Sequence, residues 1–318
     1  MNDTEQRVHF APLIEDIKLE RIIGKIENKE SSRLAVITTG VHGNEPSSVF
    51  AAKKVLRKIE LAKLKLKGTL LILTGNIKAL QADVRFIDED LNRLWEEKRI
   101  RSLIKEPKTS EEKEAKEMYE SIEPYLDRYS EKFFLDCHTT SSQTMPYISA
   151  ADQAESYRFA QQFPVHTVVG FSNHVAWSLN DFFMDEGFTG FTFEAGHHHA
   201  FTSLENHEAM IWLFLCKSGL IDPDDLEDKD ECRSNLAKYA PDGASLFQIQ
   251  YHHKLINRDD FVMNPGYVNF QKIKKGEHLA VEQEKDVTSH LDGRVLMPLY
   301  QELGQEGFFI ITPHHYNN

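Results

Sequence analysis

The chain has few cysteines and no long hydrophobic run. Its 318 residues include only Cys137, Cys216 and Cys232, an odd number without a CxxC pair. This pattern argues against a disulfide framework and is typical of a reducing compartment. No apolar stretch approaches the roughly 18 residues that a membrane-spanning helix needs. Because the N-terminus also lacks the basic and apolar regions of a signal peptide, we expect a cytoplasmic protein.

Positive charge is scarce as well. The chain has 37 lysines and arginines against 50 acidic residues, which gives a net charge of −13 at pH 7. Nucleic acids and anionic membranes attract basic surfaces, so this charge argues against both as partners. The hydrophobic content of 41% and charged content of 27% are ordinary for a globular protein. A chain of this length can fold as one large domain with a smaller one, or as two of medium size.

The N-terminal two thirds of the chain alternate between strand-like and helix-like patterns. Short, continuously apolar segments are typical of strands buried on both faces. They occur at 33–39, 69–74, 132–137, 165–170 and 189–194. Helical patterns occur at 46–62, 110–129, 151–163 and 203–218. This alternation predicts an α/β domain over residues 1–220, with a largely parallel sheet flanked by helices.

The C-terminal part has a different pattern. An acidic segment at 222–231 contains Pro223 and is the best candidate for a linker. After it, short β-like runs are separated by turn sequences such as Asn264-Pro265-Gly266. These runs lie at 246–251, 279–283, 293–299 and 307–312. We therefore predict a small β-rich domain over residues 240–318 that caps the cleft or mediates subunit contacts. The oligomeric state stays open, a homo-oligomer included.

Three residues are candidate metal ligands. His42 and Glu45 are spaced i, i+3 where a predicted strand turns into a helix, and His138 ends another predicted strand. Alone, such a pair is more often solvated and such a histidine more often a core or rim residue. In parallel sheets, however, the carboxyl ends of strands meet at one edge. Two imidazoles and one carboxylate leave one position of a tetrahedral zinc site open for water, so we predict one catalytic Zn²⁺ per chain.

A charged segment, 85–93, is a candidate anion-binding loop. It contains Arg85, Asn92 and Arg93, and arginine forks bind carboxylates in a bidentate manner. The alternative is a surface loop with internal ion pairs, in which Asp90 holds one of the arginines.

Glu194 is the candidate general base. It closes an apolar strand, where a carboxylate is costly to bury unless it is paired or functional. Beside a zinc site it could accept a proton from water and then donate it to a leaving group. An isolated strand-end glutamate would instead simply face the solvent.

Taken in order, four motifs resemble the succinylglutamate desuccinylase/aspartoacylase family of zinc-dependent amidohydrolases, which is related to the metallocarboxypeptidases. The motifs are HGNEP at 42–46, RFIDEDLNR at 85–93, DCHTT at 136–140 and FEAG at 193–196. The resemblance covers roughly residues 33–215 and extends to C-terminal segments at 265–270 and 297–301. It implies a zinc carboxypeptidase-like α/β fold and hydrolysis of the amide bond of an N-acyl amino acid or related small amide.

The resemblance also implies roles for individual residues. His42, Glu45 and His138 would be the zinc ligands, and Glu194 would activate the attacking water. Arg85 would polarise the scissile carbonyl, while Asn92 and Arg93 would bind a substrate carboxylate. Tyr300 is a further candidate for substrate binding from the C-terminal domain. Aspartoacylase-like members carry another substrate-binding arginine about ten residues before the catalytic glutamate. The segment 180–187 has none, which favours a neutral acyl group over an acidic one.

Two other functions compete with this hypothesis. A metallocarboxypeptidase would use the same ligands on peptide C-termini, and a catalytically silent protein would only bind the metal. Among the remaining residues, we expect Cys137 to be a buried thiol. We expect the histidines at 197–199 to line a loop without binding metal, and those at 252–253 and 314–315 to lie on the surface.

Overall fold

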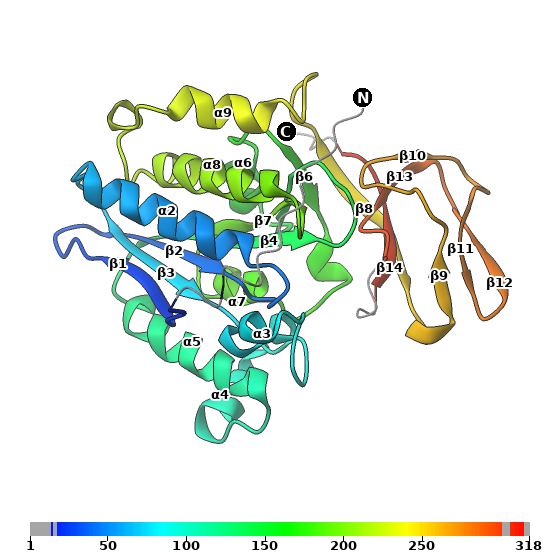
Figure 1. The fold of residues 1–318 in the computed structure, drawn as a ribbon, viewed down its shortest axis with the longest axis horizontal. Helices are drawn as coiled ribbons and strands as arrows, with labels where there is room; N and C mark the ends of the chain where they lie inside the picture. Colours follow the sequence, from blue (N-terminus) through cyan, green and yellow to red (C-terminus); the bar gives the residue numbers. More distant parts are fainter. Residues whose placement is uncertain (1–13, 15–17, 301–305, 315–318) are drawn as a thin grey trace.

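The computed structural model describes residues 14, 18–300 and 306–314 (Figure 1). Eleven strands in this part of the chain form one sheet with the order β1-β3-β2-β4-β7-β5-β6-β8-β14-β13-β10. The strands are β1 (Ile22–Ile26), β2 (Arg33–Thr39), β3 (Thr69–Thr74), β4 (Glu131–Thr140), β5 (Tyr147–Ala150), β6 (His166–Val169), β7 (Thr189–His197), β8 (Leu246–Lys254), β10 (Lys272–Ile273), β13 (Gly293–Leu296) and β14 (Glu306–Pro313).

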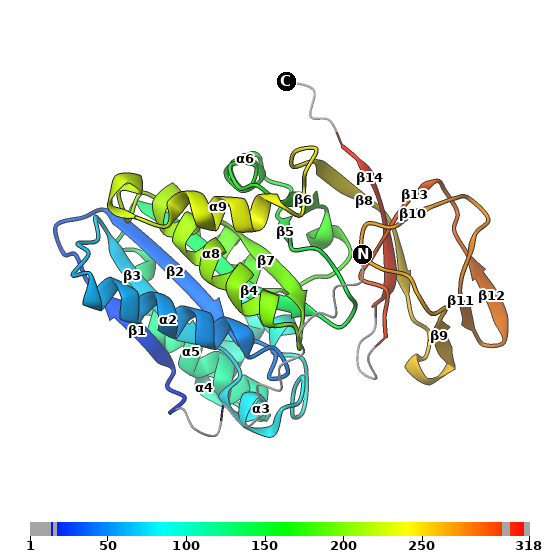
Figure 2. The same cartoon turned by 45° about the horizontal axis from the view of Figure 1, so that its top comes forward.

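Helices cover both faces of the N-terminal half of this sheet (Figures 1 and 2). On one face lie α2 (Ser47–Leu61), α6 (Ala154–Ala160), α8 (Phe201–Lys217) and α9 (Lys229–Ala237). On the other lie α4 (Glu97–Lys105), α5 (Ser110–Leu126) and α7 (Leu179–Asp185). The short helix α3 (Ile77–Ala82) follows β3. Because both faces are covered, β2 and β3 are almost wholly buried, as their apolar sequences predict.

Parallel pairing brings the carboxyl ends of three strands together. β2 pairs with β4 in parallel, and β4 with β7. Thr39 lies opposite Cys137, and His138 lies opposite Glu194. The segment carrying His42, the end of β4 and the end of β7 therefore meet at one edge of the sheet, as the strand pattern predicts.

The C-terminal strands extend the same sheet. β8 pairs with β6 in parallel, and β14 then pairs with β8 in an antiparallel direction. A separate three-stranded antiparallel sheet consists of β9 (Phe261–Met263), β11 (His278–Glu282) and β12 (Lys285–Thr288). The mixed α/β fold with a smaller C-terminal β-sheet is confirmed. The division into domains at 1–220 and 240–318 stays a prediction.

The segment 222–231, proposed as a linker, contains helical structure. The segment forms a short 3-10 helix, Pro223–Asp225, and the start of α9. Leu226, Cys232 and Leu236 are buried in the core that contains α8. Cys232 and Leu236, four positions apart, give α9 an apolar side. The acidic composition of the segment does not reveal this side.

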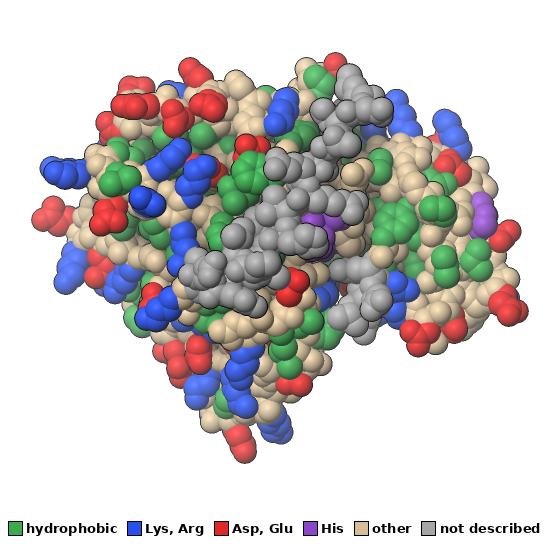
Figure 3. Space-filling model, viewed as in Figure 1, with side chains coloured by type: hydrophobic (Ala, Val, Ile, Leu, Met, Phe, Trp, Pro, Cys, Tyr) green, Lys and Arg blue, Asp and Glu red, His purple; other side chains and the backbone are tan. Residues whose placement is uncertain are grey.

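The surface differs in part from the expectation. His252 and His253 are only partly exposed, because their rings stack on Phe309 and Phe308 with centroids 4.5 and 5.0 Å apart. His314 is also partly buried, and His315 lies outside the described residues. On the face seen in Figure 3, basic and acidic side chains are intermingled. In the part of the chain that the structure describes, no helix is long and apolar enough to cross a membrane.

Candidate metal centre and active site

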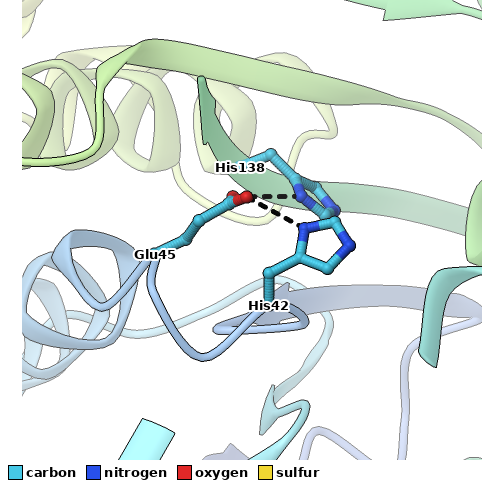
Figure 4. A group of neighbouring side chains, drawn as sticks. All are labelled: His42, Glu45 and His138. Carbon is cyan, nitrogen blue, oxygen red and sulfur yellow. Dashed lines mark hydrogen bonds and ion pairs between the residues drawn. The ribbon is translucent and has the colours of Figure 1, made fainter. Parts of the chain in front are cut away.

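His42, Glu45 and His138 converge on one point (Figure 4). One ligand atom from each residue lies within 4.8 Å of the other two. Glu45 Oε1 is 2.9 Å from His42 Nδ1, and Glu45 Oε2 is 3.2 Å from His138 Nδ1. All three side chains are buried. The structure thus brings together the three residues that the sequence proposes as ligands.

Tight backbone packing fixes the position of His42. A Cβ atom on Gly43 would lie 2.0 Å from the carbonyl carbon of Ala79, so this site accepts only glycine. The Gly43 N–H donates to the carbonyl oxygen of Arg85 over 3.1 Å. The loop that carries His42 is therefore joined directly to the predicted anion-binding loop.

Each of the two imidazoles is held by a second carboxylate. His42 Nε2 is 3.0 Å from Asp90 Oδ1, and His138 Nε2 is 2.8 Å from Asp136 Oδ2. Asp136 Oδ1 in turn accepts a hydrogen bond from the Thr38 hydroxyl over 2.6 Å. Metal-binding histidines commonly have such a partner on the outer ring nitrogen, which orients the ring and raises its basicity. The donor set and its outer partners therefore fit a divalent metal ion.

Electrostatics keep the central carboxylate ionised. Burial opposes the charged form of Glu45, but His42 and His138 together hold its pKa well below the usual range. Burial likewise opposes protonation of His138, yet Asp136 and Glu45 raise its pKa well above the usual value. A metal ligand must present a lone pair, and Glu45 meets this requirement as a carboxylate.

Glu194 lies beside this group and has an unusual environment. The side chain is buried, and its Oε2 has no hydrogen-bond partner among the described residues. Burial, reinforced by the charges of Glu45 and Asp136, raises the pKa of Glu194 to about 8. A carboxyl group with a pKa near neutrality can both accept and donate a proton at physiological pH.

Arg85 and Asp90 form a pair next to the ligands. Arg85 Nη2 donates to Asp90 Oδ2 over 2.9 Å, while Arg85 Nη1 is 4.0 Å from Glu45 Oε1. Asp90 thus holds both an arginine, as the sequence suggests, and the ring of His42. Burial opposes ionisation of Asp90, but Arg85 and His42 keep its pKa well below the usual range.

One pocket contains every predicted site residue except Tyr300. Its lining includes His42, Glu45, His138, Glu194, Arg85, Asn92 and Arg93. Tyr300 is absent from the lining. Its hydroxyl donates to the Asn264 carbonyl oxygen over 2.8 Å and accepts from the Tyr267 N–H over 2.9 Å. The structure therefore does not bring Tyr300 to the site, and its role in substrate binding stays a prediction without a supporting contact.

Other pocket residues have no signal in the sequence. A neutral polar wall includes Ser149 and Thr192, which are opposite each other on β5 and β7, and Asn180 of α7. An apolar wall combines residues from distant segments: Phe171, Val175, Met297, Leu299 and Phe309. Short or irregular segments carry most of these residues, so periodicity could not reveal them.

The three consecutive histidines do not share one environment. His198 is buried and lines the pocket, whereas His197 and His199 are partly exposed. None of them belongs to the His–Glu–His group. Cys137 is fully buried, as expected, and burial raises the pKa of its thiol well above the usual value.

Fold and site together define an α/β protein with a buried His–Glu–His group at the carboxyl ends of parallel strands. A family model described as "Succinylglutamate desuccinylase/Aspartoacylase catalytic domain" matches residues 31–210, which is more than half of the chain. The chain belongs to the succinylglutamate desuccinylase/aspartoacylase family. The resemblance drawn from the four motifs is thereby confirmed.

Curated relatives match over shorter segments. A succinylglutamate desuccinylase of Photorhabdus laumondii is 33% identical over 76 residues, 24% of this chain and 23% of the relative. An N-acyl-aromatic-L-amino acid amidohydrolase of Xenopus laevis is 36% identical over 108 residues, 34% of each chain. The matched segments thus span about a quarter to a third of these relatives.

Solved structures share the fold over nearly the whole chain. A succinylglutamate desuccinylase from Vibrio cholerae superposes with a TM-score of 0.65 at 15% identity, covering 98% of this chain and 96% of that one. Murine aminoacylase 3 superposes with a TM-score of 0.58 at 16% identity, covering 90% and 97%. Their coverage includes the C-terminal strands as well as the matched catalytic region.

Proposed function

We propose that this protein is a zinc-dependent amidohydrolase that removes a neutral acyl group from an N-acyl amino acid or related small amide. The observation that carries the proposal is one pocket that contains a buried His–Glu–His group, a carboxyl group of raised pKa and two arginines. The relatives include a succinylglutamate desuccinylase and an N-acyl-aromatic-L-amino acid amidohydrolase, which supports the same reaction class.

His42, Glu45 and His138 would hold the metal ion. Zinc bound there would supply a Lewis acid and lower the pKa of water, which are the two effects that amide hydrolysis needs. The outer carboxylates of Asp90 and Asp136 would keep both rings oriented. The same ligands can also bind cobalt or manganese. The metal content of the purified protein should therefore be measured together with its activity.

Glu194 would move the proton in both halves of the reaction. As a carboxylate it would take a proton from the attacking water while the new C–O bond forms. As the C–N bond breaks, it would deliver that proton to the amine nitrogen. Arg85 would donate a charged hydrogen bond to the carbonyl oxygen. The ion pair with Asp90 holds the guanidinium in place.

Asn92 and Arg93 would bind the carboxylate of the amino acid. Asn92 Oδ1 already accepts the Leu179 N–H over 2.8 Å, so its amide N–H groups are the ones left for a carboxylate. The wall formed by Ser149, Thr192 and Asn180 has no charged side chain. A neutral acyl group or side chain fits such a wall better than an acidic one. The C-terminal residues of the apolar wall would cap the pocket.

A panel of N-acyl amino acids tests the proposal. The zinc-loaded protein is incubated with matched N-acetyl and N-succinyl derivatives, and the released amine is measured. We expect the neutral acyl series to be hydrolysed at least about tenfold faster. Glu194→Gln should keep its zinc and lose about 10²- to 10⁴-fold in turnover.

The same panel separates the competing functions. Hydrolysis of blocked dipeptides without hydrolysis of N-acyl amino acids would favour a metallocarboxypeptidase. Zinc binding without any hydrolysis across the panel would indicate a protein that only binds metal. Unchanged turnover in Glu194→Gln would remove Glu194 from the mechanism.

A further inference from the structure

His198 is a buried pocket residue to which the mechanism above gives no role. The residue lies just after the end of β7, four positions beyond Glu194, and its side chain is only 6% exposed. Its Nδ1 is 2.7 Å from the Thr139 hydroxyl. Its Nε2 is buried and has no hydrogen-bond partner among the described residues. An unpaired buried polar nitrogen destabilises the folded protein unless a ligand satisfies it, so it calls for a function.

The contact with the Thr139 hydroxyl indicates which ring nitrogen of His198 carries the hydrogen. Among the described residues, His198 Nδ1 is the one hydrogen-bond partner of that hydroxyl. Either atom can donate in this contact, but Nδ1 is the one acceptor for the hydroxyl proton among the described residues, which favours donation from the hydroxyl to Nδ1. In a neutral ring, Nδ1 is then the acceptor and Nε2 carries the hydrogen. Burial lowers the pKa of His198 to about 3, which keeps the ring neutral at physiological pH. His198, which lines the pocket, therefore carries its hydrogen on the buried and unpaired Nε2.

His198 and Arg85 are associated with different oxygens of Glu45, His198 through Thr139 and Arg85 directly. The Thr139 N–H donates to Glu45 Oε2 over 2.8 Å, and the side chain of the same threonine holds His198. Arg85 is nearer the other oxygen, with Nη1 4.0 Å from Glu45 Oε1. Both side chains line the pocket that also contains Glu194. The pocket thus contains an uncharged donor as well as a charged one.

We propose that His198 is a further substrate-contacting residue, whose Nε2–H donates a hydrogen bond to the carbonyl oxygen of the scissile amide. The inference rests on the proposed amidohydrolase function. The carbonyl oxygen gains negative charge as water adds to the carbon, so a fixed donor stabilises the transition state more than the bound substrate. Thr139 acts as a positioning residue, because it fixes both the ring and its tautomer.

Nitrogen NMR tests the tautomer without any activity measurement. The zinc-loaded protein is labelled with ¹⁵N-histidine, and the His198 signals are assigned by their loss in His198→Gln. We expect a protonated Nε2 and an unprotonated Nδ1. Thr139→Ser should preserve this pattern, whereas Thr139→Val, which lacks the hydroxyl, should change it. A proton on Nδ1 of the wild-type ring would overturn the proposal.

Kinetics with N-acetyl-L-phenylalanine test the contact itself. His198→Leu should lower kcat by about 10²-fold, the usual effect of removing one donor to a developing oxyanion, with KM changed by less than about threefold. In His198→Gln the side-chain amide N–H can take the place of Nε2–H, so kcat should return to within about tenfold of wild type. Zinc content should be equal in all variants.

Each failure has its own signature. If wild type hydrolyses no N-acyl amino acid, the proposed function fails. If wild type is active and His198→Leu keeps kcat within about twofold, only the His198 proposal fails. Loss of zinc in both His198 variants would assign the residue to metal-site structure instead. A rise in KM at constant kcat would make His198 a ground-state binding residue and would also contradict the proposal.

Discussion

At the scale of single residues, the two outer carboxylates differ in burial. Asp136 is fully buried between His138 and Thr38, whereas Asp90 keeps 17% of its side chain exposed. A negative charge without access to water interacts more strongly with its partner. Asp136 should therefore contribute strongly to the basicity of His138, and the proposed metal affinity should depend on its charge.

Replacing Asp136 with asparagine tests this dependence. Asp136→Asn retains a side-chain oxygen near His138 Nε2 but removes the charge, so we expect zinc affinity to fall by about 10- to 100-fold. Competition with a zinc-binding dye measures the change. Thr38→Val is the matched control, because it removes the hydrogen bond to Asp136 and keeps the carboxylate. Equal affinities in wild type and Asp136→Asn would contradict the proposed role.

A second residue, His207, should make the free energy of unfolding depend on pH. Its Nδ1 is 3.2 Å from the Ser47 hydroxyl, its Nε2 is 3.1 Å from the His138 carbonyl oxygen, and burial lowers its pKa to about 3. In the unfolded chain a histidine has a pKa of about 6.5. Between these values the unfolded state binds more protons, so this contribution to stability is complete above about pH 6.5 and is lost as the pH falls.

Urea denaturation of the metal-free protein measures the effect. Between pH 4.5 and 6, the slope of the free energy of unfolding against pH should be steeper in wild type than in His207→Gln by about 1.4 kcal/mol per pH unit, the value for one proton. The difference between the two proteins cancels the titration of the other groups. Parallel curves over this range would show that His207 is not a buried neutral ring.

The sequence predicts some site residues far better than others. His42, Glu45, His138 and Glu194 follow apolar strands, and the structure places all four in one pocket. The outer carboxylate of Asp136 has no separate signal, because a polar residue inside a strand can have many causes. The roles of Thr139 and His198 depend on side-chain geometry after folding, which periodicity does not encode.

At the scale of elements, β7 illustrates how closely the sheet is packed behind the site. A Cβ atom on Gly190 would lie 2.0 Å from the Phe134 carbonyl oxygen of β4. That neighbour is backbone, so no side-chain rotation can relieve the contact. The same two strands carry His138 and Glu194, which face each other in register. Glycine at this position therefore allows the spacing on which the site depends.

Gly190→Ala should accordingly destabilise the protein by about 3 kcal/mol, the upper part of the range for overpacking. Chemical denaturation of the metal-free protein gives the free energy of unfolding. Thr189→Ala, at the partly exposed neighbouring position, is the control and should cost less than about 1 kcal/mol. If both variants are equally stable, β4 and β7 are not packed as closely as the structure indicates.

The elements found from sequence are those with strong, continuous patterns. The predicted strands at 33–39 and 69–74 match β2 and β3, and the helix at 203–218 matches α8 within two residues. β5 and α7 were not predicted, because they have only four and seven residues. Short elements form when neighbouring strands and helices pack against them. Those contacts come from residues that are distant in the sequence, so a local pattern does not reveal them.

At the scale of the whole molecule, the pocket joins the two ends of the chain. Met297, Leu299 and Phe309 come from the C-terminal strands and their connections, yet they line the same pocket as His42. Phe309 and Met297 pack in a core that also contains Tyr147 and Val168 from the N-terminal part. A substrate at the metal site would therefore contact both regions, and the C-terminal region should influence substrate choice.

Phe309→Ala tests this influence on selectivity. The side chain contributes apolar surface to the pocket, and losing such a contact typically costs about 1–3 kcal/mol of binding, or 10- to 200-fold. We expect kcat/KM for N-acetyl-L-phenylalanine to fall by at least about tenfold, and that for N-acetylglycine, which has no side chain to contact the wall, to stay within about threefold. Phe308→Ala is the matched control, because Phe308 is the neighbouring phenylalanine on the same strand, is equally buried and does not line the pocket. It should lower stability without changing the ratio of the two substrates. Equal losses for both substrates in Phe309→Ala would mean that the C-terminal strands support the fold of the pocket but do not select its ligand.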